Sequence, residues 1–203
     1  MRRVAGLDLS LAGSAAVVLD DDGCPSAVLC FTSVQRDEAH RPAWLELRRS
    51  VSVARRDIAG DYARTADVAE AVRTFLRRHL PTGSVVGIED HAYGAKGTAV
   101  YQLGHLHGMV RRDVVASLAC RFLLLGVGEV KQIAAGRGNA GKAEMVAAAA
   151  EHLDLGKLSR HTKEAIADAF AIARITWQIE RARAGRIDAS CVSRFILERP
   201  LIG

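Results

Sequence analysis

The stretch that decides the fold lies at residues 4–13 and reads Val4-Ala5-Gly6-Leu7-Asp8-Leu9-Ser10-Leu11-Ala12-Gly13. An apolar run that contains one acid and ends in small residues is typical of a central strand that carries a carboxylate to its end. A buried, unpaired Asp costs several kcal/mol. Asp8 therefore either accepts turn hydrogen bonds at a strand end or belongs to a site that compensates its charge. Two later acids in similar settings favour the second interpretation.

The size and charge of the chain narrow the classes of protein to which it can belong. Its 203 residues are enough for one compact domain with a substantial core. We predict that this domain spans residues 1–185, followed by a C-terminal tail over 186–203. Lys and Arg number 28 against 23 acids, a net charge of +5 with a pI near 9.3. A mild basic excess of this kind favours an anionic partner such as nucleic acid.

The cysteines and the lengths of the apolar runs indicate the cellular compartment of the protein. There is no CxxC pair and no apolar run as long as a membrane span. No signal peptide opens the chain, because an Asp interrupts the short apolar stretch after the first arginines. We predict a cytoplasmic protein with no membrane partner and with reduced thiols at Cys24, Cys30, Cys120 and Cys191.

Hydrophobic periodicity predicts an α/β fold. Short turns join three predicted strands, 3–11, 14–20 and 26–33, into an antiparallel meander. Further along the chain we predict strands over 85–89 and 121–125 and helices over 65–80, 98–119, 142 to about 153 and 162–183. In the Arg-rich stretch 35–63, only a helix from about Trp44 to Val53 is suggested. The prediction is a five-stranded mixed sheet, the meander plus two parallel strands, flanked by helices.

Three further acids accompany Asp8 at the same predicted edge of the sheet. Glu89 ends the strand 85–89, and Asp168 lies on the last long helix with Glu164 one turn before it. Converging carboxylates repel one another unless a cation compensates them, and oxygen ligands suit Mg²⁺ or Mn²⁺. Two such ions, about 3.5–4 Å apart, can activate water and stabilise the leaving oxygen in phosphodiester cleavage.

A basic, glycine-rich segment precedes that last helix. It contains Lys131, Gly136, Arg137 and Gly138, and it ends at Lys142, which begins a predicted helix. Glycines let a backbone approach DNA closely, and a helix N-terminus favours phosphate. A glycine-rich loop is also often only a tight turn, but the lysines and Arg137 favour phosphate contact.

Taken in order, these pieces resemble the RuvC Holliday junction resolvases of the RNase H-like nuclease superfamily, especially their phage-borne members. The resemblance runs from Gly6-Leu7-Asp8 to the final helix and covers most of the chain. It is carried by four segments: the first-strand Asp, Ile88-Glu89 with Tyr93-Gly94-Ala95-Lys96, Val130-Lys131-Gln132 with Gly136-x-Gly138-x-Ala140-x-Lys142, and Asp168-Ala169-Phe170-Ala171-Ile172-Ala173.

The resemblance implies an activity, cofactors and partners. It implies a homodimer that binds four-way DNA junctions and makes paired, symmetric nicks with 5′-phosphate ends, using two Mg²⁺ ions or Mn²⁺ in their place. Asp8, Glu89 and Asp168 match the family's metal ligands. The family's companion ligand lies three residues before the final Asp, where this chain has Ala165. Glu164 is the candidate to replace it.

The resemblance also implies a DNA-binding set. Lys131 and Lys142 match lysines that lie near the junction phosphates. Tyr93 and Lys96 lie on the loop after Glu89, where an aromatic side chain can stack on a junction base. Ordinary packing remains the alternative for Tyr93.

Three alternatives differ from a junction resolvase. A broader structure-selective nuclease, acting on flaps, forks or hybrids, would carry the same carboxylates. A branched-DNA-binding module without activity would keep the fold without binding metal. An actin-like ATPase or sugar kinase also opens with an Asp-bearing strand, but it needs two lobes, for which the chain is too short.

Overall fold

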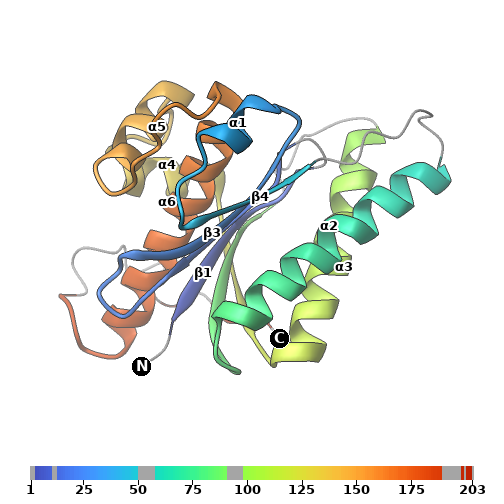
Figure 1. Cartoon of the computed structure of the whole chain (residues 1–203). Helices are drawn as coiled ribbons and strands as arrows, with labels where there is room; N and C mark the ends of the chain where they lie inside the picture. Colours follow the sequence, from blue (N-terminus) through green and yellow to red (C-terminus); the bar gives the residue numbers. More distant parts are fainter. Residues whose placement is uncertain are drawn as a thin grey trace.

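A six-stranded mixed sheet runs through the middle of the molecule, with helices on both of its faces (Figure 1). This arrangement comes from a computed structural model, which describes residues 3–10, 13–49, 58–90, 98–188, 198 and 200–202. The strands are β1 (Val4–Asp8), β2 (Ala15–Leu19), β3 (Pro25–Thr32), β4 (Leu45–Arg49), β5 (Val85–Glu89) and β6 (Arg121–Leu125).

The helices form two layers. In Figure 1, α2 (Ile58–His79) and α3 (Thr98–Leu118) lie on one side of the sheet. The other side carries α4 (Val127–Ala135), α5 (Lys142–Ala150) and α6 (Arg160–Arg183), while the short α1 (Arg36–Ala39) lies near the start of α6. None of the helices in the described ranges is long and apolar enough to cross a membrane.

The order of strands in the sheet is β4-β3-β2-β1-β5-β6. The predicted meander is confirmed, because β1 pairs antiparallel with β2 and β2 antiparallel with β3. The predicted parallel half is confirmed as well, because β5 lies parallel to both β1 and β6. Parallel strands end at the same edge of a sheet, so Asp8 and Glu89 leave the sheet side by side.

The sheet has one strand more than the five predicted. β4 lies parallel to β3 at the edge of the sheet, in a stretch for which a helix from Trp44 was predicted. That prediction is wrong because Leu45 and Leu47 alternate with charged residues, which is the period of a strand. Charged side chains are common on edge strands, where they discourage pairing with other chains. The basic composition therefore concealed a short edge strand.

Two helices begin earlier than predicted. α2 begins at Ile58 rather than at residue 65, so Gly60 lies inside the helix and does not break it. Tyr62, in its second turn, is 62% exposed, so hydrophobic periodicity did not reveal the start of the helix. α6 begins at Arg160, two residues before the prediction, behind the N-cap residue Ser159.

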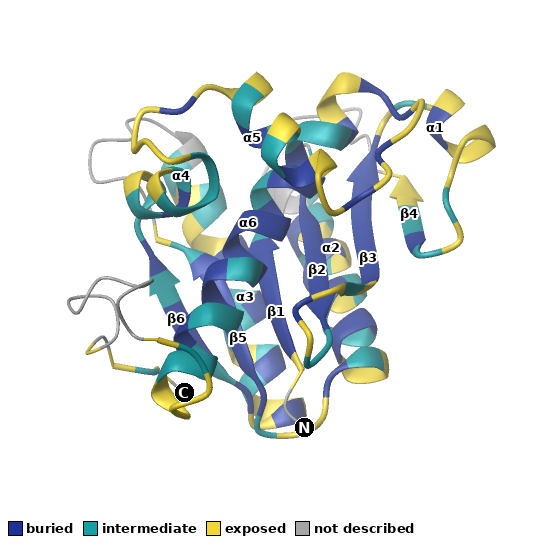
Figure 2. Cartoon of the chain, turned by 90° about the vertical axis from the view of Figure 1, so that its left-hand side faces the viewer, coloured by how far each residue is buried: buried dark blue, intermediate teal, exposed yellow. Residues whose placement is uncertain are grey.

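Alternation along the strands divides the core between the two faces of the sheet. Ala5 and Leu7 of β1 pack toward α2 and α3, whereas Val4 packs toward α6. Figure 2 shows the central strands buried along most of their length, and β1 and β5 become partly exposed only at Asp8 and Glu89. Two of the described cysteines, Cys30 and Cys120, are buried, and Cys24 is exposed.

Two glycines allow α6 to approach the sheet closely. Gly6 and Gly87 are register partners on β1 and β5. A Cβ at Gly6 would lie 2.1 Å from the backbone nitrogen of Ala173, and one at Gly87 would lie 2.0 Å from Oγ1 of Thr176. The backbone of α6 therefore rests directly on the central strands, at a distance that only glycine allows.

Part of the predicted C-terminal tail returns to the sheet. Ile202 forms an antiparallel bridge with Phe122 of β6, and Leu201 packs against the core beneath α4. The division of the chain at residue 185 stays a prediction.

Candidate active site

The two acids at the strand ends point to the face of the sheet that α6 covers. Side chains alternate along a strand, so Asp8 shares a face with Gly6, and Glu89 shares one with Gly87. Each acid lies two residues after a glycine that touches α6. The glycines thus bring the helix to the sheet, and the acids follow at the point where the strands end.

The helix α6 brings two more acids to this edge. Glu164 and Asp168 are four residues apart and lie on the same side of the helix. A cleft of about 480 Å³ lies between this side and the strand ends. Its lining residues are Asp8, Ser10, Gly13, Phe31, Thr32, Ser33, Glu89, Lys142, His161, Thr162, Glu164, Ala165 and Asp168. All four predicted carboxylates therefore line one cleft.

Basic side chains neutralise the two carboxylates on α6. Nζ of Lys142, at the start of α5, forms an ion pair with Oδ2 of Asp168, whose side chain is only 14% exposed. Glu164 accepts a hydrogen bond of 2.7 Å from Nε of Arg160, one turn earlier on the same helix. The strand carboxylates Asp8 and Glu89 form no ion pair among the described residues.

The strand carboxylates consequently have perturbed acidities. Burial, together with repulsion from Asp168 and Glu89, raises the pKa of Asp8 to about 7, although Lys142 partly opposes this. Burial and Asp168 also raise the pKa of Glu89, against the lowering effects of Lys142 and Lys131. Lys142 and Lys131 therefore compensate the burial and mutual repulsion of these carboxylates only in part.

The raised pKa of Asp8 predicts a stability difference that depends on pH. Its folded pKa of about 7 exceeds the ordinary 3.8, so the parent chain loses stability as pH rises from about 4 to about 7. The Asp8→Asn variant lacks this loss. Without divalent cations we expect it to be about 2–4 kcal/mol more stable than the parent at pH 8 and equally stable near pH 4. Thermal melts in chelator across this range measure the difference.

The control for this prediction is Asp67→Asn, which changes an exposed Asp on α2. Its stability is expected to stay within about 0.5 kcal/mol of the parent at every pH. A constant difference between Asp8→Asn and the parent from pH 4 to pH 8 would contradict the raised pKa.

The donor set of the cleft fits a hard divalent cation. In the described part of the chain, no three His, Cys, Asp or Glu side chains are near enough to one another to hold one metal ion as they stand. The chemistry of the site is nevertheless suitable, because carboxylate oxygens are the ligands that Mg²⁺ prefers and the excess negative charge invites a cation. The ammonium group of Lys142 already supplies one positive charge beside the Asp168 carboxylate.

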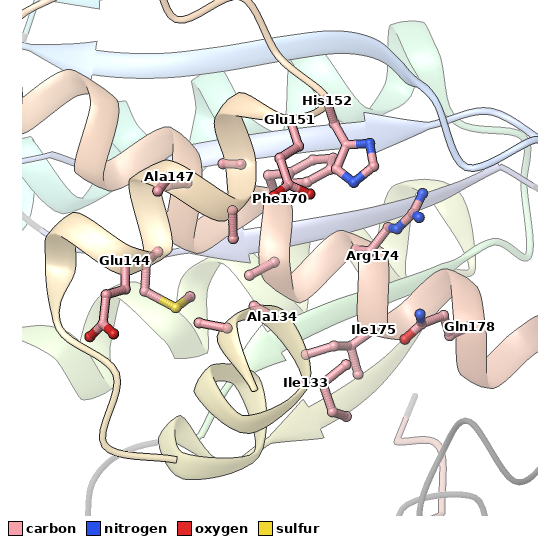
Figure 3. Close-up of a pocket in the computed structure, with 16 residues that line it drawn as sticks. Ile133, Ala134, Glu144, Ala147, Glu151, His152, Phe170, Arg174, Ile175 and Gln178 are labelled. Carbon is pink, nitrogen blue, oxygen red and sulfur yellow. The ribbon is translucent and has the colours of Figure 1, made fainter. Parts of the chain in front are cut away.

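A second groove, of about 530 Å³, lies between α4, α5 and α6 (Figure 3). Its walls consist mainly of alanines and other apolar side chains, and His152 lies over Phe170 with ring centroids 5.5 Å apart. None of the predicted site residues lines it. The carboxylate chemistry therefore belongs to the cleft at the strand ends.

Solved structures with the same arrangement of elements exist. Over 91% of this chain and 97% of the other, the structure matches Thermus thermophilus RuvC with a TM-score of 0.58 at 21% identity. The chain has the RuvC fold. T. thermophilus RuvC in complex with Holliday junction substrate gives a TM-score of 0.59 at 18% identity, over 92% of this chain and 98% of that one.

A yeast protein also matches the structure of this chain. The mitochondrial Holliday junction resolvase Ydc2 matches with a TM-score of 0.52 at 14% identity, over 94% of this chain and 83% of that one. No protein-family model matches the sequence, and no curated protein matches it significantly. The likeness to RuvC that the motifs predicted is thus confirmed for the fold, and the phage-borne subgroup stays a prediction.

Within the RuvC fold, the predicted basic segment lies beside the cleft. Lys142 lines it, and Lys131 is near enough to Glu89 to lower the pKa of that carboxyl. Arg137 is exposed and forms an ion pair with Glu144. Tyr93 and Lys96 lie outside the described residues.

The local backbone structure accounts for the two glycines of this segment, Gly136 and Gly138. Gly136 ends α4 with φ of 77°, a left-handed conformation that favours glycine. A Cβ at Gly138 would lie 3.2 Å from the carbonyl oxygen of Gly128. Their predicted closeness to DNA is not tested by these contacts and stays a prediction.

Several lining residues were not predicted as site residues. His161 lies seven residues before Asp168, on the same side of α6, and this helical spacing could have indicated it. Thr32 and Thr162 come from segments 130 residues apart, and their buried hydroxyl oxygens lie 3.0 Å from each other. Nothing in the sequence pattern indicated that contact.

Proposed function

We propose that the chain is a Mg²⁺-dependent endonuclease that resolves four-way DNA junctions. The observation that carries this proposal is the single cleft lined by Asp8, Glu89, Glu164 and Asp168, with Lys142 among them. Support comes also from the RuvC fold, since one RuvC structure of that fold is a complex with Holliday junction substrate. The net charge of +5 suits an anionic partner.

The proposed chemistry assigns roles to the residues of the cleft. Asp8, Glu89, Glu164 and Asp168 would hold two Mg²⁺ ions, or Mn²⁺ in their place, and the metal supplies an activated water and stabilises the leaving oxygen. Lys142, which pairs with Asp168 in the structure, would offer its ammonium group to a DNA phosphate. Lys131 and Arg137 extend this basic surface along α4 and the loop that follows it.

We propose further that two copies of the chain act together. A four-way junction has two equivalent strands to cut, so a symmetric dimer presents one cleft to each of them. The expected products are paired nicks with 5′-phosphate ends.

The decisive experiment uses a synthetic mobile four-way junction, a matched flap and a matched duplex, each with Mg²⁺ and with chelator. Nicks are mapped on every strand. Paired, symmetric, Mg²⁺-dependent nicks on the junction are expected. Equal or faster cutting of the flap would indicate a broader structure-selective nuclease, and binding without any cutting would indicate a DNA-binding module.

The role of Glu164 is tested separately, because Ala165 occupies the position of the family's companion ligand. We expect Glu164→Gln to cut about 10- to 100-fold more slowly at limiting Mg²⁺, since it removes one of the proposed ligands. The matched control is Arg160→Gln, which removes the ion-pair partner of Glu164 and leaves the carboxylate in place. Rates of Glu164→Gln equal to those of the parent would exclude Glu164 as a ligand.

A further inference from the structure

A carboxylate outside the cleft is completely buried behind its wall. Asp37, in the short helix α1, has no exposed surface. Burying a charged group is costly unless hydrogen bonds replace the lost water. Asp37 receives four: from the backbone N–H of Ser159 at 2.7 Å, and from the hydroxyls of Ser159, Thr162 and Thr32 at 2.7, 2.6 and 3.3 Å.

These hydrogen bonds keep Asp37 charged. Burial alone would raise its pKa, but the hydrogen bonds from Thr162, Ser159 and Thr32 outweigh burial, and the pKa is lowered. The carboxylate is thus an anion at the N-terminus of α6, where the positive end of the helix dipole favours it.

The contacts of Asp37 complete the N-terminal cap of α6. Oγ of Ser159 accepts a hydrogen bond from the backbone N–H of Thr162. In a capping box, a Glu or Gln at the third helical position would return a hydrogen bond to the N-cap backbone. Thr162 holds that position and cannot do so, and Asp37, which is 122 residues away in the sequence, accepts from the Ser159 N–H instead.

The first turn of α6 depends on this cap more than the rest of the helix does. From Ala165 onward, α6 is held by extensive burial against the sheet. In the turn before it, Arg160 and His161 are exposed, and Thr162 alone is buried, at 1%. The same turn carries Glu164 into the cleft.

We propose that Asp37 is a positioning residue that fixes the first turn of α6, and thereby the Glu164 carboxylate, at the cleft. The proposal rests on the nuclease function proposed above. Asp37 itself touches neither the cleft nor a substrate. It acts through Ser159 and Thr162, and through Thr32, which lines the cleft from the end of β3.

Three variants and one control test this role. Asp37→Asn keeps the shape of the side chain and removes its charge. Thr162→Val removes the hydroxyl, whereas Thr162→Ser keeps it and should restore the parent's behaviour. The control for lost stability is Thr176→Val, which removes a buried hydroxyl from the same helix, where Oγ1 of Thr176 donates to the carbonyl of Ile172, far from the cleft.

The first readout is hydrogen exchange along α6, which requires neither metal nor DNA. Asp37→Asn and Thr162→Val are expected to speed exchange at the amide of Lys163, which donates to the carbonyl of Ser159, and to leave residues 169–179 protected. Thr176→Val should spare the amide of Lys163. Unchanged exchange at Lys163 in Asp37→Asn would overturn the proposal.

The second readout is junction cleavage as a function of Mg²⁺. We expect Asp37→Asn to need more Mg²⁺ and to cut about 10- to 100-fold more slowly at limiting Mg²⁺. On a Glu164→Gln background, Asp37→Asn should cause little further loss, because both changes act through one carboxylate. Full additivity of the two losses would overturn the proposal.

The outcomes separate this proposal from the one on which it rests. If the parent cuts junctions and Asp37→Asn shows the parent's Mg²⁺ dependence, the positioning role is wrong and the function stands. If the parent cuts no DNA, the proposed function fails and the positioning of a metal ligand fails with it, whatever hydrogen exchange shows of the cap.

Discussion

The Asp168→Asn variant is expected to bind four-way junctions at least as tightly as the parent and to cut them on the order of 10²- to 10³-fold more slowly. Asp168 is the most central acid of the cleft, since it raises the pKa of both Asp8 and Glu89 and pairs with Lys142. The amide removes a proposed metal ligand, a loss comparable to removing one electrostatic group at a reacting centre. It also removes negative charge near the DNA. Single-turnover cleavage and gel-shift binding measure the two effects.

Asp8→Asn and Glu89→Gln are expected to behave in the same way, because each removes one oxygen ligand from the same cleft. The control is Glu151→Gln, which changes an exposed acid in the groove between α4, α5 and α6 and should cut at the parent's rate. Joint loss of binding and cleavage in the three cleft variants would mean that these acids support the fold rather than the reaction.

Gly6→Ala is expected to destabilise the chain by about 3 kcal/mol or more, or to prevent folding. The added Cβ would lie 2.1 Å from the nitrogen and 2.7 Å from the Cα of Ala173, and 2.4 Å from the carbonyl oxygen of Ala169. These are backbone atoms, so no rotamer change relieves the overlap and α6 must move away from β1. Thermal or urea unfolding measures the loss.

The matched control is Gly104→Ala in α3, where an added Cβ meets no described atom within 4 Å. Alanine is the better helix former, so this variant is expected to gain about 0.5–1 kcal/mol. A folded Gly6→Ala variant with the parent's stability would contradict the close contact between α6 and β1. A folded but inactive one would show that the separation of Asp8 from Asp168 matters by itself.

The sequence predicted those features that depend on local pattern. Apolar runs that end in Asp8 and Glu89 predicted β1 and β5, and short turns predicted the antiparallel meander. Both predictions succeeded because each depends on residues that are neighbours in the sequence. The convergence of Asp8, Glu89, Glu164 and Asp168 followed from the rule that parallel strands end at one edge and from helical spacing.

The features that were missed depend on contacts between distant segments. β4 is held by its pairing with β3, and its charged residues obscured a pattern of only two leucines. The buried carboxylate of Asp37 looks like any other acid of a polar loop, and its partners at Ser159 and Thr162 lie more than 120 residues away. Local propensity contains no information about such pairs.

The position of α6 in the chain has a consequence for synthesis. The helix is made after all six strands, yet it covers the face of the sheet that Asp8 and Glu89 share. A ribosome-bound chain that ends before residue 160 therefore has α2 and α3 for one face of the sheet, but it lacks α6 for the other face and has only half of the four carboxylates. The apolar surface that α6 would bury is exposed in such a chain, and this exposure favours aggregation until α6 has been synthesised. The proposed nuclease activity therefore depends on the docking of the last helix, because Glu164 and Asp168 lie on it.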